Sequence, residues 1–245
     1  MKKIISFFLS VIILSASSFA TAKSGENWYF SSRGNNERPG LPLLDQSLGK
    51  GIGSDEKVLY LTFDAGYENG NVEKVVNVLR EEKVQGAFFV LKHFVEANPE
   101  LCKQILKDGN LLCNHTADHP NITTLSPQAL ENELKELERV CEEICGEKPS
   151  PYFRPPEGAY SKESLEEVAR LGYRTVFWSL AWADWDNNNQ KSPEYAMEKL
   201  CSRVHNGAVI LLHPTSSTNA AILGDFIREM KACGYRFGSL EELWQ

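Results

Sequence analysis

The sequence has no excess of positive charge and no stripe of basic residues. It contains 26 Lys and Arg against 33 Asp and Glu, which gives a formal net charge of −7. Affinity for nucleic acids is largely electrostatic, so this balance argues against nucleic-acid binding as the main activity. Internal repeats and low-complexity tracts are also absent, which argues against a solenoid or fibrous architecture.

Paired cysteines with the C-x-x-C spacing of a structural zinc site are absent too. An even number of cysteines in an exported chain permits up to three disulfides, but the spacing here shows no disulfide framework. We expect mostly unpaired thiols that pack as small apolar residues. The six cysteines are Cys102, Cys113, Cys141, Cys145, Cys201 and Cys233.

The apolar run near the N-terminus is too short to span a membrane comfortably as a permanent helix. Lys2 and Lys3 precede it, and small residues up to Ala22 follow it. This layout predicts a secretory signal peptide over residues 1–22, with an uncleaved anchor as the alternative. We therefore expect a secreted or extracytoplasmic protein. Residues 23–56, rich in Gly, Pro, Ser and Asn, predict an irregular leader that lies over the domain surface.

Short apolar runs alternate with helical periodicity from Val58 to the C-terminus. Ser126-Pro127 and Ser192-Pro193 are typical of helix starts, and glycines follow several of the helical segments. About seven such strand-helix units predict an α/β fold with a parallel barrel, with an open doubly wound sheet as the alternative. The runs span residues 58–63, 87–91, 111–113, 152–153, 175–180, 208–212 and 235–237, and the helices lie near 71–83, 95–108, 127–145, 161–171, 193–204 and 219–232.

Polar side chains follow most of the predicted strands. Because ligand sites form at the C-terminal edge of a parallel sheet, we expect these sequence-distant groups to meet in one place. They are Asp64, Asn114, His115, His119, Arg154, Asp184 and His213.

Three of the five histidines fall at these strand ends. His115 and His119 are four residues apart and are predicted to bind one metal ion, with Pro120 favouring an extended backbone at His119. The alternative is an ordinary capping or surface histidine. His93 also follows a strand and is predicted to be a wall residue.

Five ordered motifs carry a family resemblance. Thr62-Phe63-Asp64-Ala65-Gly66-Tyr67, His115-Thr116-Ala117-Asp118-His119, Arg154-Pro155-Pro156-Glu157-Gly158, Asp184-Trp185 and Leu211-Leu212-His213 resemble the motifs of polysaccharide deacetylases with a NodB-homology domain, carbohydrate esterase family 4. The resemblance covers about residues 57–242 and implies a distorted (β/α)7 barrel. Further stretches, including Asn188-Asn189-Gln190-Lys191, are similar to the delta-lactam-biosynthetic de-N-acetylases, which act on muramic acid residues of spore-cortex peptidoglycan.

The resemblance implies a role for each catalytic residue. Asp64 matches the general base that takes a proton from the attacking water, and Arg154 would hold it ionised and oriented. His213 matches the general acid that protonates the leaving amine, and Asp184 would orient it and raise its pKa. A backbone N–H within residues 158–160 would complete an oxyanion site, as in related enzymes.

The resemblance also implies a divalent metal held by His115 and His119, which would polarise the substrate carbonyl. Most family members carry a second acid directly after the base, as a third ligand, whereas this chain has Ala65. Two neutral imidazoles favour weaker binding of a metal such as zinc or manganese, with water or substrate in the vacant position.

Aromatic residues that follow the strands are predicted to contact the sugar, with packing as the alternative. They are Tyr67, Tyr160, Trp182 and Trp185. Trp178 lies within a predicted strand and is expected in the core.

With the signal-peptide layout, the resemblance implies a secreted, metal-assisted de-N-acetylase of N-acetylmuramic acid in peptidoglycan, acting in delta-lactam formation in the spore cortex. Glycan strands of peptidoglycan are the expected partner, and we expect neither nucleic acid nor a stable protein partner. One alternative is a deacetylase of N-acetylglucosamine polymers or chitooligosaccharides. Another is a carbohydrate-binding protein whose catalysis has lapsed.

Overall fold

The computed structural model describes residues 25–31, 37–42 and 44–245. The signal peptide predicted for residues 1–22 lies outside the described residues. Of the helices in this described part, none combines the length and apolarity that crossing a membrane requires.

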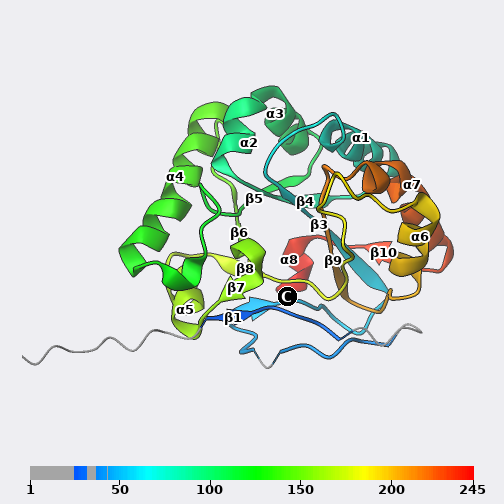
Figure 1. Ribbon diagram of the computed structural model, residues 1–245, viewed down its shortest axis with the longest axis horizontal. Helices are drawn as coiled ribbons and strands as arrows, with labels where there is room; N and C mark the ends of the chain where they lie inside the picture. Colours follow the sequence, from blue (N-terminus) through cyan, green and yellow to red (C-terminus); the bar gives the residue numbers. More distant parts are fainter. Residues whose placement is uncertain (1–24, 32–36, 43) are drawn as a thin grey trace, which may run out of the picture.

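The centre of the fold is a curled sheet of eight strands in which every pairing is parallel (Figure 1). After the last residue of β8 the chain runs on to Leu180, which forms a parallel bridge with Ile210 and so joins the two sides of the curl. This arrangement matches the predicted distorted (β/α)7 barrel and not an open doubly wound sheet. The strands are β2 (Gly49–Lys50), β3 (Val58–Ala65), β4 (Gly86–Val90), β5 (Leu111–Asn114), β6 (Ser150–Phe153), β8 (Arg174–Val176), β9 (Ala208–Leu212) and β10 (Arg236–Phe237).

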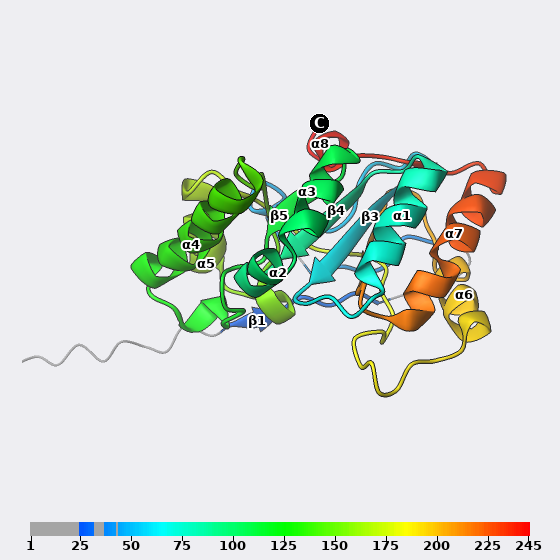
Figure 2. The ribbon, with the colours of Figure 1, turned by 90° about the horizontal axis from the view of Figure 1, so that it is seen from above.

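Helices surround the outside of this sheet, as the two views show (Figures 1 and 2). One helix expected near 95–108 is two, because Pro99 has no N–H to continue the backbone hydrogen bonds of the first. A short last helix, not predicted, packs Leu240 and Leu243 against the start of β3 inside the sheet. The helices are α1 (Val72–Glu82), α2 (Lys92–Ala97), α3 (Pro99–Lys107), α4 (Pro127–Cys145), α5 (Lys162–Arg170), α6 (Pro193–Cys201), α7 (Ser217–Ala232) and α8 (Leu240–Leu243).

Local signals in the sequence account for several helix ends. The Ser126 and Ser192 side chains accept backbone N–H bonds at the starts of α4 and α6, and proline occupies the first turn of both helices. Gly146 ends α4 with a φ of 82°, a left-handed conformation that glycine adopts without steric cost.

Side chains of β3 alternate between the two faces of the sheet. Leu61, Phe63 and Ala65 belong to the outer core beneath the helices. Thr62 and Asp64 face the interior, where a buried arginine contacts both. The alternation explains why an acid can end this apolar strand, since Asp64 emerges on the inner face at the strand's C-terminal edge.

The leader is more ordered than expected. Its strand β1 (Glu26–Asn27) pairs antiparallel with β7 (Ala159–Tyr160), and β2 joins the main sheet beside β8. The four residues of β1 and β2 are therefore paired strands and not irregular segments. Two-residue strands carry too little periodicity to be read from sequence.

All six cysteines are free, which confirms the expectation of unpaired thiols. Cys102, Cys113 and Cys141 are buried, and Cys233 is exposed. Burial raises the pKa of the Cys102 and Cys113 thiols, so these groups stay protonated and unreactive.

Candidate active site

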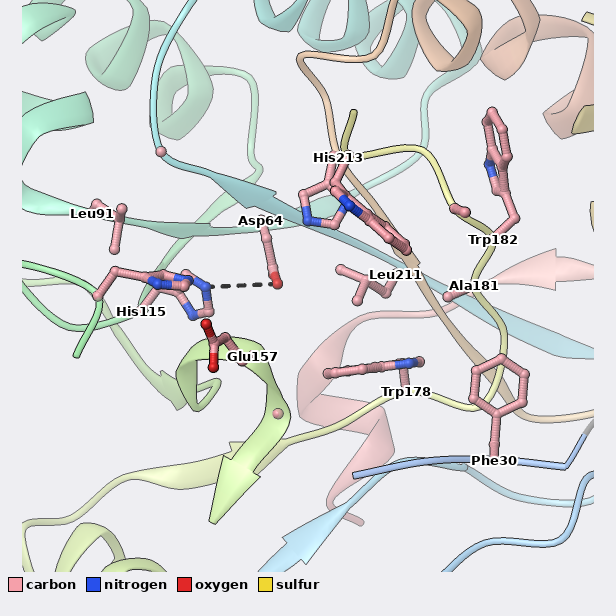
Figure 3. Close-up of a pocket in the computed structure, with 15 residues that line it drawn as sticks. Phe30, Asp64, Leu91, His115, Glu157, Trp178, Ala181, Trp182, Leu211 and His213 are labelled. Carbon is pink, nitrogen blue, oxygen red and sulfur yellow. Dashed lines mark ion pairs between the residues drawn. The ribbon is translucent and has the colours of Figure 1, made fainter. Parts of the chain in front are cut away.

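A cavity of about 730 Å³ opens at the C-terminal edge of the strands, and Asp64 and His213 both line it (Figure 3). His115 and His119 line the same cavity from the loop after β5. The structure thus brings the predicted base, acid and both histidines together. Glu157, Trp178, Trp182, Trp185 and Phe30 complete much of the wall.

Arg154 fills the centre of the sheet beneath this cavity and is completely buried. Its Nη1 donates to Asp64 Oδ1 at 2.7 Å, and its Nη2 donates to Thr62 Oγ1 at 2.8 Å. The Nε donates to the carbonyl of Val176 at 3.0 Å, and the guanidinium also stacks over the Phe89 ring. These contacts fix the side chain, so Asp64 faces a positive charge that cannot move away.

The charge of Asp64 is governed by two opposing effects. Burial alone would raise the pKa of its carboxyl, but the charge and hydrogen bond of Arg154, with the nearby His115 and His213, together outweigh burial, so the pKa is lowered. Asp64 is therefore a carboxylate at neutral pH. Its Oδ1 is taken by Arg154, while Oδ2 lies 3.7 Å from His115 Nε2 and remains available to a water.

His115 is held as a neutral imidazole. Its Nδ1 lies 2.8 Å from the carbonyl oxygen of Arg154, which can only accept, so Nδ1 carries the proton. Burial lowers the pKa of His115 to about 4. At neutral pH its Nε2 therefore presents a lone pair, which is the form that binds a metal.

The loop that carries the two histidines is fixed from both sides. Asn114, which is buried, donates to Tyr173 Oη at 2.9 Å and accepts the Thr116 N–H. Glu133 of α4 accepts two further backbone N–H groups of the loop.

The backbone at His119 differs from the prediction. An extended conformation was expected before Pro120, but φ of His119 is 59°, in the left-handed region. The His119 N–H donates to Thr116 Oγ1 at 3.0 Å and closes a tight turn, which overrides the proline preference. This turn brings the two imidazoles to a centroid distance of 5.0 Å.

His213 and Asp184 form a second pair of candidate catalytic residues. Asp184 Oδ1 accepts from His213 Nδ1 at 2.8 Å, and its Oδ2 accepts the His213 backbone N–H at 2.8 Å. Burial alone would lower the pKa of His213, but the hydrogen bond and charge of Asp184 raise it above the usual 6.5. His213 is thus partly protonated at neutral pH, with Nε2 directed away from Asp184.

Asn219, at the start of α7, orients this pair and was missed in the sequence. Its Nδ2 donates to Asp184 Oδ2 and, at 3.1 Å, to the carbonyl of His213. Its Oδ1 accepts from the Trp182 indole Nε1 at 3.1 Å. Nothing in the local sequence separates Asn219 from an ordinary polar residue in the first turn of a helix.

Thr62 is a second missed residue, and here a signal existed. It stands two positions before Asp64 on the same face of β3, so the strand period places both side chains beside Arg154. Glu157 is a third residue that was missed in the sequence. It lines the cavity, and its backbone is strained, with a φ of 57°.

The aromatic predictions have mixed outcomes. Trp182 and Trp185 line the cavity, whereas Tyr67 and Tyr160 are not among its lining residues. Tyr160 is buried beneath the leader, where its hydroxyl donates to Glu26. Trp178, expected in the core, is only half buried and lines the cavity, because the chain leaves regular strand geometry after β8.

Two other expectations differ from the structure. His93 is exposed at the start of α2 and does not line the cavity. The N–H groups of Gly158 and Ala159 donate to Pro155 and Pro156 carbonyls. They are therefore not free to stabilise an oxyanion.

The two residues predicted to bind a metal ion, His115 and His119, fit that role in part. His115 offers a lone pair, and His119 lies beside it, but within the described ranges no three His, Cys, Asp or Glu side chains are placed to hold one ion. Ala65 is fully buried in the outer core and does not line the cavity. Two imidazoles are thus the donor set that this chain presents, and water or substrate would fill the remaining positions.

Comparisons with known proteins agree with this geometry. The profile of the family "Polysaccharide deacetylase" matches residues 51–176. The peptidoglycan-N-acetylmuramic acid deacetylase PdaA of Bacillus subtilis is 40% identical over 223 residues, which cover 89% of this chain and 85% of that protein. A peptidoglycan-N-acetylglucosamine deacetylase of Bacillus cereus is 31% identical and covers 78% of this chain and 90% of its own.

The solved structure of Bacillus subtilis PdaA, described as a family 4 carbohydrate esterase, superposes with a TM-score of 0.87 at 39% identity. It covers 90% of this chain and 97% of the PdaA chain. With the profile match, the identity and the shared fold in agreement, this chain belongs to the polysaccharide deacetylases of carbohydrate esterase family 4.

Proposed function

We propose that this protein removes the acetyl group from N-acetylmuramic acid residues of peptidoglycan, outside the cytoplasm and with the assistance of a metal. The observation that carries the chemistry is the pairing of Asp64 with Arg154 and of His213 with Asp184 on one cavity. One pair keeps a carboxylate ionised, and the other keeps an imidazole able to donate a proton.

The reaction follows from these two groups. Asp64 Oδ2 accepts a proton from the water that attacks the acetamide carbonyl carbon. His213 Nε2 then gives a proton to the amide nitrogen as the C–N bond breaks, so the products are acetate and a free amine. A divalent metal on His115 and His119 would polarise the carbonyl oxygen and lower the pKa of bound water.

Muramic acid as the substrate is supported by the similarity to the Bacillus subtilis N-acetylmuramic acid deacetylase over most of both chains. A free amine on a muramic residue without its peptide stands close to the lactyl carboxyl of the same sugar. Deacetylation would therefore supply the amine that a later ring closure to a delta-lactam requires. The predicted signal peptide supports action at the cell wall or spore cortex.

A second candidate is deacetylation of N-acetylglucosamine polymers. None of the described residues that line the cavity is Lys or Arg. Glu157 adds a negative charge to the wall. Such a wall offers no cation to a lactyl carboxylate and suits an uncharged sugar. The Bacillus cereus relative, named as an N-acetylglucosamine deacetylase, supports the same alternative.

Acetate release with product mass, measured on peptide-free muramic glycans and on chitooligosaccharides, tests both. We expect release from muramic glycans by the wild type and at least a 10³-fold lower rate for Asp64→Asn, which removes the base while keeping its shape. Release from chitooligosaccharides alone would select the second candidate. Binding without release from either substrate would select a lapsed enzyme.

A further inference from the structure

Three consecutive aromatic residues of the leader have three different environments. Trp28 is 7% exposed, Tyr29 is 63% exposed, and Phe30 is half buried on the wall of the cavity that holds Asp64 and His213. A segment that merely covered the surface would not be expected to direct one ring into the active-site cavity. The contacts on either side of Phe30 show how that ring is placed.

Trp28 anchors the leader on the N-terminal side of Phe30. Its backbone N–H donates to the Gly158 carbonyl at 2.8 Å, and its indole Nε1 donates to the Trp178 carbonyl at 2.7 Å. Its ring stacks on Phe177 with a centroid distance of 4.2 Å and an interplanar angle of 14°. A buried stacked indole with both donors satisfied is a rigid anchor.

Ser31 anchors the other side. It exchanges two backbone hydrogen bonds with Gly40, at 2.9 and 3.2 Å. Phe30 therefore lies between Trp28, which is held on the barrel, and a backbone pairing of Ser31 within the leader. The ring is pre-positioned, so binding a ligand against it costs little conformational entropy.

The Trp178 ring faces the same cavity as Phe30, with Ala181 and Leu211 beside them (Figure 3). Gly158 makes this arrangement possible, because a Cβ there would lie 2.8 Å from the Trp178 ring and 3.2 Å from Trp28. This part of the wall carries no charged side chain, and Figure 3 shows it on the other side of Asp64 from His115.

We propose that Phe30 and Trp178 form a binding subsite for an uncharged pyranose ring that neighbours the sugar being deacetylated. The C–H groups of a pyranose pack on aromatic faces, and an apolar wall without a cation favours a neutral sugar over one that bears a carboxylate. This inference rests on the proposed glycan deacetylase function. It makes the leader part of the substrate site.

The test is calorimetric binding in the Asp64→Asn background, with a peptide-free muramic tetrasaccharide and the N-acetylmuramic acid monosaccharide, which lacks a neighbouring sugar, as probes. Phe30→Ala should weaken tetrasaccharide binding about tenfold, and it should weaken monosaccharide binding by a clearly smaller factor. Tyr29→Ala, which truncates the neighbouring exposed ring, is the matched control and should change neither affinity. Equal effects on both probes, or none on either, would overturn the subsite.

Two further measurements keep the result interpretable. Phe30→Leu retains apolar bulk without a ring face and should behave as Phe30→Ala does, whereas Phe30→Trp should restore tetrasaccharide binding. Loss of binding in Phe30→Ala with full binding in Phe30→Leu would show a packing role only. Wild-type acetate release separates the two proposals, because Phe30-dependent binding without release would leave the subsite standing and refute the deacetylase.

Discussion

Arg154 and Asp64 form an ion pair at 2.7 Å in which the guanidinium is entirely withdrawn from solvent. Every guanidinium nitrogen of Arg154 contacts Asp64, Thr62 or a backbone carbonyl of Val176 or Phe177. The pair is thus part of the interior of the sheet as well as of the candidate active site. Changing it should affect stability and activity together.

Arg154→Lys is expected to lower kcat by at least about 10²-fold and stability by about 3 kcal/mol, because lysine cannot reproduce the planar set of donors in a buried position. Acetate release and chemical denaturation measure the two effects. Arg170→Lys changes an exposed ion pair on α5 and should alter stability by less than about 0.5 kcal/mol. A stable and active Arg154→Lys would contradict the central role of the pair.

The pH profile of activity should fall at alkaline pH with a midpoint above 6.5. His213 acts as the acid only when protonated, and Asp184 raises its pKa, so activity is present below that pKa and is lost as pH rises through it. Asp64 remains ionised because its pKa is lowered, so it does not limit activity near neutral pH. Asp184→Asn should move the alkaline limb to lower pH, and an unmoved limb would rule out His213 as the titrating acid.

Asn219→Leu should reduce kcat more than it raises KM and should shift the same alkaline limb, because Asp184 loses a buried donor. An effect of about tenfold on kcat is expected from one lost hydrogen bond to a charged group. Asn132→Leu, on the exposed face of α4, is the control. A fall in melting temperature with an unchanged pH profile would mean that Asn219 only supports packing.

Metal binding should depend on His115. Titration of the apoprotein with Zn²⁺ or Mn²⁺ in a calorimeter at neutral pH should show weak binding, which His115→Ala abolishes and the exposed His93→Ala retains. Below about pH 4 the imidazole takes up a proton, so the affinity should disappear as pH falls through the pKa of His115. Binding that survives in His115→Ala would place the metal elsewhere.

All six cysteines should react with a thiol reagent after unfolding without reductant, since none is paired. In the native protein Cys233, which is exposed, should react first, while Cys102 and Cys113 are protected by burial and by their raised pKa values. Absorbance of the released chromophore gives the count. Fewer reactive thiols after unfolding would reveal disulfides.

The fold and the candidate catalytic residues could be predicted from the sequence where apolar residues recur at a regular spacing or where motifs occur in a fixed order. The strand ending at Asp64 and the helix 127–145 were read correctly because their apolar spacing is long and regular. The segment 177–180 was misread, because its apolar residues continue after the regular strand has ended. Trp178 therefore came out as core although it lines the cavity.

Contacts between distant residues account for the rest of what sequence could not predict. Asn219 and Phe30 lie on segments with no motif. Asn219 is placed by its hydrogen bond to Asp184, and Phe30 is placed by the hydrogen bond that its neighbour Trp28 donates to the Trp178 carbonyl. Tyr160 was placed in the site because it follows a strand, but the leader covers it. A covering segment is set by tertiary pairing, which a single sequence does not display.

The pairing of β1 with β7 limits how much of the N-terminal region can be lost. Proteolytic trimming that passed Trp28 would strip an indole from Phe177 and leave the Trp178 carbonyl without its donor. If the predicted signal peptide is removed, a cut that fell a few residues too far along would therefore disturb the cavity through the loss of Trp28.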